Sequence, residues 1–403
     1  MKKIIFILSI SLIVLLIVWL VMRLNNPDSV VKSGYQASTR NTKIIVYDVE
    51  GLERQAKQII PSGGFDYIAG GAETEKTMRR NISAFDNVDI YPRVLTGVDN
   101  PDTSTSILGI DISLPVIAAP AAAHGLAHVS AEAGSARGVA QAGTIMSVST
   151  YASSTLKEIA NAGGGAPQWF QLYLSKDADF NRAIVDQAER LGYRAIILTV
   201  DAPIGGNRWR DVRNDFKFPL ELPNVAKKSI KTKGQGIGAV FAAAQNKITP
   251  YDIMRVKGMT KLPVIVKGIQ HPYDAEVAIR AGADAIWVSN HGGRQLDGAP
   301  AAFEVLPDIA RQVNKRVPII FDSGIRRGQH VFKAIASGAD VVAIGRPVIY
   351  GLALGGWRGV VSVFDYIKSD LKRVMTLAGT QTIEDIKKTQ LRPRCVTVRC
   401  GNI

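Results

Sequence analysis

The sequence predicts an α/β protein built on a parallel (β/α)8 barrel. Three observations predict this fold: short apolar runs rich in Val and Ile, helix-like segments between them, and near-copies at residues 279–286 and 335–342. Runs of this kind are typical of strands buried on both faces, and strands alternating with helices form repeated β-α units, eight of which close a barrel. The predicted strands are residues 114–122, 144–149, 169–174, 195–201, 262–267, 285–291, 317–323 and 341–346.

Other segments follow from local patterns. Residues 48–60 have helical spacing, and the glycine-rich stretch 63–71 holds two aromatic residues, which suits a helix start that closes one mouth of the barrel. Residues 101–112 have the pattern of a hairpin before the first barrel strand. Helices are expected between strands, for example over 179–191 and 272–281.

The connection after the fourth strand is unusually long. It runs over about residues 203–247 and includes several glycines, so we expect part of it to be mobile. Long connections in compact domains are usually lids or binding segments, and we interpret this one as a lid. Residues 204–247 hold nine Lys or Arg against three Asp or Glu. This charge is either an ordinary solvated face or a surface attracted to anionic lipid headgroups.

The N-terminus carries an uncharged apolar run of 19 residues, 4–22, preceded by Lys2 and Lys3 and followed by Arg23. About 20 residues cross a bilayer, whereas the apolar part of a cleaved secretory signal is usually about 7–15 residues long. A single-pass membrane anchor is therefore expected, with a cleaved signal as the alternative and the orientation left open. The expected organisation is an anchor at 1–23, a tether at 24–45 and a barrel domain at 46–403.

Composition narrows the class of protein. Hydrophobic residues make up 46% of the 403-residue chain, which is ample for a large core and argues against disorder. The net charge is +14, yet no basic helix or stacking-aromatic pattern points to nucleic acid. Cys395 and Cys400 lie far in sequence from the strand ends, which excludes a thiol nucleophile there, and we expect no metal site.

Catalytic groups of such barrels lie at the carboxyl ends of the strands. The predicted strand ends carry Ala122, Ser147, Gln171, Tyr173, Thr199, Asp201, Lys267, Ser289, His291, Asp322, Ser323, Gly345 and Arg346. So many polar and small residues at one end of the strands predict a site rather than a core.

The loops after the last two strands predict a phosphate site. Residues 322–328 and 345–347 offer glycine amides and guanidinium groups where barrels often hold phosphate. The alternative is a pair of tight turns with surface arginines.

The segment after the sixth strand predicts acid–base chemistry on a carboxylate. His291 can take a proton near neutral pH, and Arg294 can grip a carboxylate with two parallel hydrogen bonds. Arg208 offers a second carboxylate contact, and Asp201 could orient His291 and stabilise its protonated form. Lys267 either pairs with a carboxylate or faces a group that becomes anionic. Two tyrosines are either hydrogen-bond donors to a substrate or core-filling aromatics: Tyr67 and Tyr173.

Together these residues resemble the FMN-dependent 2-hydroxy-acid oxidases and dehydrogenases over about residues 47–385. The stretch 289–296, Ser-Asn-His-Gly-Gly-Arg-Gln-Leu, carries the resemblance, and residues 120–128, 207–208 and 351–357 are most similar to the bacterial L-lactate oxidase branch. The resemblance implies FMN as cofactor and a homotetramer. It also implies oxidation of L-lactate, or a similar short L-2-hydroxy acid, to the 2-oxo acid.

The resemblance also implies roles for individual residues. Along the flavin ring would lie Pro120, Ala121 and Ala122, and its polar edge would be bonded by Ser147, Gln171 and Thr199. Lys267 would face the N1–C2 carbonyl side of the ring and stabilise the anionic reduced flavin, and Ser289 would contribute to cofactor binding. Those holding the ribityl chain and phosphate would be Asp322, Ser323, Gly324, Arg326, Gly345 and Arg346. Those binding the substrate would be Tyr67, Tyr173, Arg208 and Arg294, with His291 as the base, supported by Asp201.

Several functional alternatives remain at this stage. The substrate electrons leave as a hydride or through a carbanion, and pass to O2, giving H2O2, or to a membrane carrier such as quinone. A catalytically silent flavin-binding protein is a further alternative. So is an isomerase or nucleotide dehydrogenase on the same kind of barrel.

Overall fold

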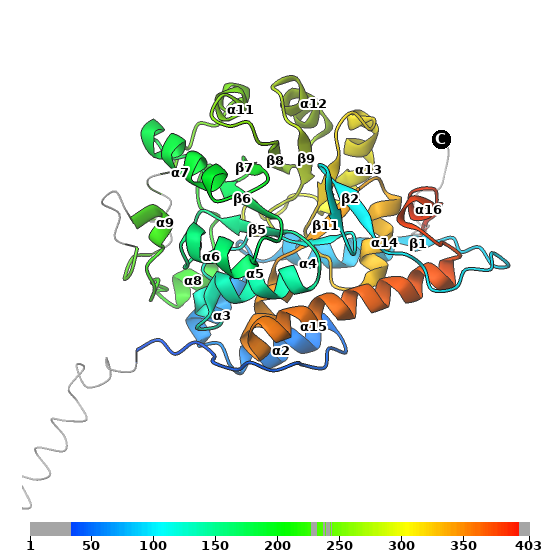
Figure 1. Cartoon of the computed structure of the whole chain (residues 1–403), viewed down its shortest axis with the longest axis horizontal. Coiled ribbons are helices and arrows are strands. Elements are labelled where there is room, and N and C mark those ends of the chain that lie inside the picture. The colour runs from blue at the N-terminus through cyan, green and yellow to red at the C-terminus, as the bar shows by residue number, and fades with distance from the viewer. Residues whose placement is uncertain (1–33, 227–231, 237, 239–241, 243, 395–403) are drawn as a thin grey trace, which may run out of the picture. The chain divides into compact units, whose positions relative to one another are not determined.

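Eight parallel strands close a barrel in the computed structural model, which describes residues 34–226, 232–236, 238, 242 and 244–394 (Figure 1). The closed order is β10-β11-β4-β5-β6-β7-β8-β9, so each strand pairs with its sequence neighbour and β11 pairs with β4. Each predicted run overlaps one strand, which confirms the barrel. The strands are β4 (Val116–Ala118), β5 (Met146–Ser149), β6 (Gln168–Leu172), β7 (Ile196–Thr199), β8 (Val264–Ile269), β9 (Ala285–Val288), β10 (Ile319–Phe321) and β11 (Val341–Ile344).

Helices between the strands form the outer layer (Figure 1). Their ends follow local signals: the Thr155 side chain and Glu158 form a capping box at the start of α6, and Pro272 occupies the first turn of α12. The expected helices over 179–191 and 272–281 are confirmed as α7 and α12. The helices are α5 (Ala131–Gln141), α6 (Leu156–Gly163), α7 (Ala178–Arg190), α11 (Pro250–Lys257), α12 (Pro272–Arg280), α13 (Ala302–Val313), α14 (Gly328–Ala336) and α15 (Arg346–Ala378).

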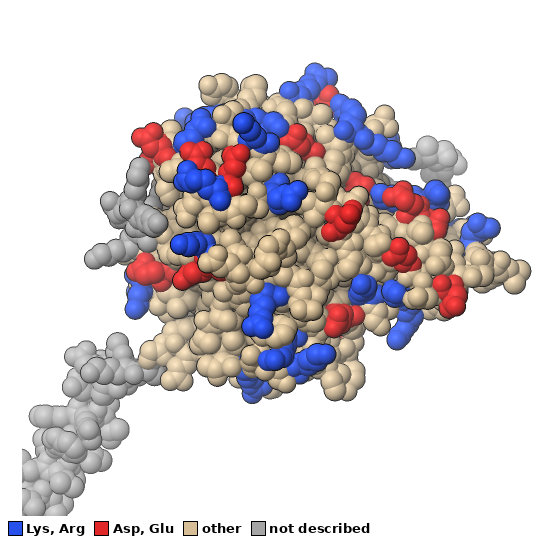
Figure 2. All heavy atoms as spheres, viewed as in Figure 1, with Lys and Arg blue, Asp and Glu red and all other residues tan. Residues whose placement is uncertain are grey.

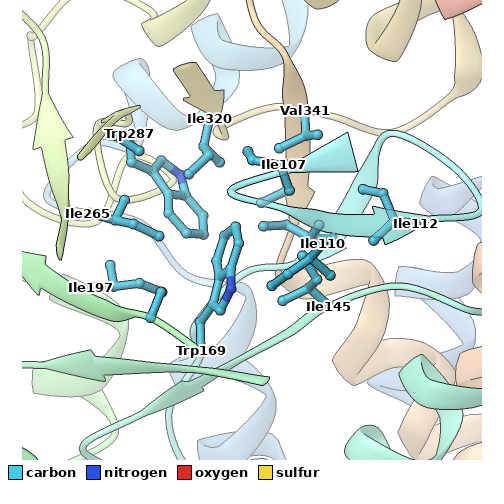
Figure 3. Close-up of a cluster of buried hydrophobic side chains, with 14 residues drawn as sticks. Ile107, Ile110, Ile112, Ile145, Trp169, Ile197, Ile265, Trp287, Ile320 and Val341 are labelled. Atoms are coloured by element: carbon cyan, nitrogen blue, oxygen red, sulfur yellow. The ribbon is translucent and has the colours of Figure 1, made fainter. Parts of the chain in front are cut away.

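A hairpin closes the amino-terminal end of the barrel, as the pattern at 101–112 predicted. It consists of β2 (Thr105–Ile107) and β3 (Ile110–Ile112), which pair antiparallel. Its isoleucines pack against Trp169 and Trp287, both fully buried, in the apolar cluster of Figure 3. Because this end of the barrel is filled with apolar side chains, a polar site is confined to the other end.

The segment before the barrel also follows prediction. Helix α2 (Val49–Lys57) is capped by the side chain of Asp48, and α3 (Ser62–Ala69) follows it. The remaining elements are α4 (Lys76–Ser83), η2 (Ala84–Asn87), η3 (His124–Leu126), α16 (Ile383–Lys387), and β1 (Val88–Ile90) paired with β12 (Leu391–Pro393).

The predicted anchor at 1–23 lies outside the described residues, as do residues 24–33 of the predicted tether and both cysteines. The chain divides into two units, residues 1–36 and 37–403. Within the second unit, Ser38 N–H donates to Ala127 O at 3.2 Å and Thr42 N–H to Gly355 O at 3.1 Å. The unit that holds the barrel therefore begins before the expected boundary at residue 46, because backbone pairing attaches this polar stretch to the barrel.

Among the described residues, α15 is the one helix long and apolar enough to cross a bilayer by length and composition. However, 78% of its most apolar window is buried inside the protein. It kinks at Gly355 and Gly356, where residues 40–42 approach so closely that a Cβ on Gly355 would lie 2.2 Å from Thr42 O. Helix α15 is therefore a packed helix of the barrel's outer layer.

The predicted lid, 203–247, is described only in part and contains α8 (Trp209–Arg213) and α9 (Pro223–Ala226). Two of its aromatic rings, Phe216 and Phe218, pack on Tyr67 of α3 with ring centres 5.2 and 5.1 Å away. The lid thus covers the helix that the sequence placed at the barrel mouth.

Candidate active site

One pocket lies at the carboxyl ends of the barrel strands. It encloses about 970 Å³ of empty space, part of which is open solvent. Most predicted site residues line it: Tyr67, Pro120, Ala121, Ala122, Tyr173, Arg208, Lys267, His291, Arg294, Asp322, Ser323, Gly324, Arg326, Gly345 and Arg346. The other predicted residues are not among its lining: Ser147, Gln171, Thr199, Asp201 and Ser289.

His291 is held between a carboxylate and a phenol. Its Nδ1 lies 2.9 Å from Asp201 Oδ1, and its Nε2 lies 3.2 Å from the Tyr173 hydroxyl. Because an ionised carboxylate only accepts, Nδ1 carries the proton and the Nε2 lone pair is directed at Tyr173. Three residues that were predicted at the ends of three different strands therefore form one hydrogen-bonded chain, in which Nε2 of His291 is the proton acceptor.

Burial sets the protonation of this pair. It lowers the pKa of His291 below its ordinary value, which the charge of Asp201 only partly offsets. Burial alone would raise the pKa of Asp201, but the charge of Lys267 and the hydrogen bond from His291 lower it below its ordinary value. The resting pair is therefore neutral His291 beside ionised Asp201, the state in which His291 can take a proton.

Two guanidinium groups flank the same ring. The Arg208 and Arg294 guanidinium carbons each lie 5.2 Å from the centre of the Tyr67 ring. Burial, together with the charges of Arg208 and Arg346, lowers the pKa of Arg294. Crowding of buried like charges is relieved when an anion binds between them.

The donors of these arginines are not equally engaged. Arg294 Nη1 donates to Ile68 O at 3.2 Å and Gly70 O at 2.7 Å. By contrast, Nε and Nη1 of Arg208 are buried without a hydrogen-bond partner among the described residues. Asp211 Oδ2 lies 3.7 Å from Arg208 Nη1, an ion pair too long for a hydrogen bond. A buried guanidinium with open donors fits a ligand carboxylate.

Lys267 pairs with a carboxylate, one of the two alternatives that the sequence left open. Its Nζ donates to Ser289 Oγ at 2.9 Å and lies 3.5 Å from Asp322 Oδ2. Ser289 Oγ in turn donates to Asp322 Oδ1 at 2.6 Å. The lysine also lines the pocket, so its charge is fixed at the wall by side chains from β9 and β10.

Three buried polar atoms test whether a flavin fits. Ser147 Oγ, Gln171 Nε2 and Thr199 Oγ1 have no hydrogen-bond partner among the described residues. They lie on the neighbouring strands β5, β6 and β7, and each would cost free energy if left unpaired. These are the three residues that the resemblance assigns to the polar edge of the flavin ring. The chain therefore fits a cofactor that supplies their partners.

The other end of the pocket suits a phosphate. Arg326 and Arg346 line it, and Gly345 caps the start of α15, where backbone N–H groups favour anions. Gly324 has φ +102°, and a Cβ there would lie 2.1 Å from Asn81 O, so this turn requires glycine. Arg346 also donates to backbone carbonyls, Gly70 O at 2.8 Å among them, contacts that the sequence did not predict.

Two polar residues of the pocket wall were not predicted from the sequence, Ser149 and Tyr151. The Tyr151 ring stacks on Tyr173 with ring centres 5.0 Å apart, and Ser149 Oγ donates to Gln171 Oε1 at 3.1 Å. Both lie at or just beyond the end of a predicted strand. Extending the strand-end rule by two residues would have found them.

Comparisons with known proteins agree with this site. The family model described as FMN-dependent dehydrogenase matches residues 56–393. An L-lactate oxidase of Lentilactobacillus hilgardii is 53% identical over 363 residues, 90% of this chain and 98% of that protein. The human 2-hydroxyacid oxidase 1 is 39% identical over 87% of this chain and 97% of its own length. A solved lactate oxidase of Pediococcus acidilactici is 54% identical, with a TM-score of 0.86 and coverage of 90% and 98%. The chain therefore belongs to the FMN-dependent dehydrogenase family, and FMN is its cofactor.

Proposed function

We propose that this chain oxidises L-lactate to pyruvate with bound FMN and passes the electrons to O2, forming H2O2. The observation that carries the proposal is the convergence on one pocket of a neutral histidine, paired with a buried carboxylate, with the buried Arg208 and the partly buried Arg294. Relatives named L-lactate oxidase support the substrate.

The arginines bind and orient the substrate. Arg208 has open donors, and Arg294 has nitrogens that do not bond backbone carbonyls. These groups bind the two carboxylate oxygens of the substrate. The Tyr67 ring packs against both guanidinium groups and helps to hold them in place. The carboxylate is thereby fixed, which leaves the hydroxyl-bearing carbon in a defined orientation.

His291 removes the hydroxyl proton of the substrate at Nε2. The Tyr173 hydroxyl, which contacts the same nitrogen, donates to the substrate oxygen or holds it in line. Asp201 stabilises the imidazolium that forms, because its carboxylate accepts from Nδ1. When bound, FMN would take up the α-hydrogen together with its bonding pair of electrons, while the hydroxyl proton goes to His291. The Lys267 ammonium supplies a fixed positive charge for the negative charge that develops in the pocket.

The pH profile of kcat/KM follows from the state of His291. A protonated His291 cannot take a proton, so activity is present above its pKa and is lost as the pH falls through it. Since burial lowers that pKa, the acid limb should be centred below 6.5. Asp201→Asn removes the charge that raises the pKa of His291, so the limb should move to still lower pH. An acid limb centred above 6.5 in the unmodified enzyme would contradict this assignment.

Substrate identity is tested by peroxide production from a panel of acids: L-lactate, D-lactate, glycolate and (S)-mandelate. The proposal predicts the highest kcat/KM for L-lactate. A higher value for glycolate or mandelate would change the assigned substrate but not the class of reaction. No turnover with any of these acids would indicate a flavin-binding protein that lacks this activity.

We further propose that residues 1–23 anchor the protein in a membrane and that the enzyme assembles as a homotetramer. The 19-residue uncharged run at 4–22 supports the anchor, and the family resemblance motivates the tetramer. An anchored enzyme would have quinone as a second candidate acceptor. Membrane fractionation of cells making the full chain, against cells making the chain without residues 1–23, tests the anchor. Equal recovery of the two proteins in the soluble fraction would refute the anchor.

Sedimentation of the chain without residues 1–23 tests the tetramer.

A further inference from the structure

The loops that follow β7 and β9 are fastened together beside the pocket by one side chain, Gln295. Its Oε1 accepts from Gly206 N–H at 3.1 Å, and its Nε2 donates to Ile204 O at 2.9 Å and Asp201 O at 3.3 Å. All three partners belong to the loop after β7. Both amide hydrogens and the amide oxygen of Gln295 are therefore used across this junction.

The two loop backbones also touch at Gly206. A Cβ there would lie 2.1 Å from Arg294 O and 2.9 Å from the Gln295 Cα, so no other residue fits without separating the loops. This close approach is independent of the side-chain hydrogen bonds and points to the same junction. We refer to Gly206 and Gln295 together as the loop clasp.

Both functional pairs of the site are formed across this junction. Asp201 comes from the loop after β7, and its partner His291 from the loop after β9. In the same way, Arg208 follows the first loop and Arg294 belongs to the second. A change in the relative position of the loops would therefore alter the His291–Asp201 bond and the spacing of the two guanidinium groups together.

A third segment supports each loop by a single backbone bond. Ala72 N–H donates to Gly293 O at 2.9 Å, and Glu73 N–H donates to Asn207 O at 2.7 Å. These bonds hold each loop to residues 72–73 but do not join the loops to each other. The clasp joins the loops to each other directly, as the His291–Asp201 bond also does.

We propose that Gln295 is a positioning residue that sets the spacing of Arg208 and Arg294 and the orientation of Asp201 against His291. The inference rests on the proposed function, because it assigns the two arginines to the substrate carboxylate. Gln295 itself does not line the pocket, so its effect on the reaction is transmitted through the loops.

The test compares Gln295→Ala and Gln295→Glu with Gln312→Ala in the FMN-loaded full chain. Gln312 is a matched control, since its side-chain amide also bonds another element, at Glu276 on the exposed outer surface. Pyruvate binding is measured by calorimetry, and the pH profile of kcat/KM with L-lactate is recorded beside it.

For Gln295→Ala we expect pyruvate binding weaker by about tenfold, kcat/KM lower by at least as much, and an acid limb displaced from that of the unmodified enzyme. Gln295→Glu keeps the acceptor for Gly206 but loses both donated bonds, so its effect should lie in the same direction. Gln312→Ala should match the unmodified enzyme in all three measurements.

A Gln295→Ala enzyme with a lower melting temperature but unchanged pyruvate affinity and pH profile would overturn the proposal, because a merely structural role has that signature. If Gln295→Ala does not retain FMN, Gln295→Glu decides by the same titration. If L-lactate fails to react with the unmodified enzyme while pyruvate binding still depends on Gln295, the proposed substrate is wrong and the clasp stands.

Discussion

Replacing His291 with alanine is expected to slow reduction of the bound FMN by L-lactate by about 10²–10⁴-fold, the usual contribution of a general base. The FMN itself should stay bound, because the groups that fit its ring edge and phosphate lie on other strands and loops. Stopped-flow absorbance under anaerobic conditions measures the reduction rate, and the flavin-to-protein absorbance ratio measures retention.

The matched control for this experiment is His271→Ala. His271 is an exposed histidine that caps α12 through Tyr273 N–H and does not line the pocket. Its loss should leave the reduction rate unchanged. A His291→Ala enzyme that is reduced as fast as the unmodified one would remove His291 from its role as base.

Replacing Arg294 with lysine is expected to raise KM for L-lactate, and Kd for pyruvate, by about ten- to a hundredfold. Arg294 uses one nitrogen for two backbone carbonyls and still has other donors for a carboxylate. A lysine ammonium keeps the charge but cannot hold the carbonyls and the ligand in the same fixed geometry.

Arg311→Lys provides the control, because Arg311 pairs with Asp308 on the surface of α13. That exchange should not change KM. If Arg294→Lys binds pyruvate with unaltered affinity, the carboxylate lies elsewhere and the assignment of the arginine pair is wrong.

The barrel could be predicted because its signals are local. Buried parallel strands are short apolar runs, and each of the eight runs overlaps a strand. Most strands are shorter than their runs, however: the run 114–122 yields only Val116–Ala118. Its last residues leave the hydrogen-bonded ladder to line the pocket, as Ala121 and Ala122 do.

The site could be predicted as a set of residues but not as a set of contacts. Topology alone brings the ends of parallel strands together, which is why Asp201 and His291 were paired from sequence. The engagement of Lys267 with Asp322 and of Arg346 with Gly70 O depends on how closely distant segments approach. The backbone hydrogen bond between Ser38 and Ala127 also depends on how closely distant segments approach, and no local sequence pattern encodes that approach.

The central claim is that this pocket transfers electrons from L-lactate to FMN and then to O2. The most direct test mixes the FMN-loaded protein with L-lactate without oxygen, follows the visible flavin absorbance, and then admits air. We expect rapid bleaching, followed by fast recovery with formation of H2O2. Bleaching with slow recovery would contradict O2 as the acceptor, and no bleaching at all would contradict the assignment of L-lactate as the substrate.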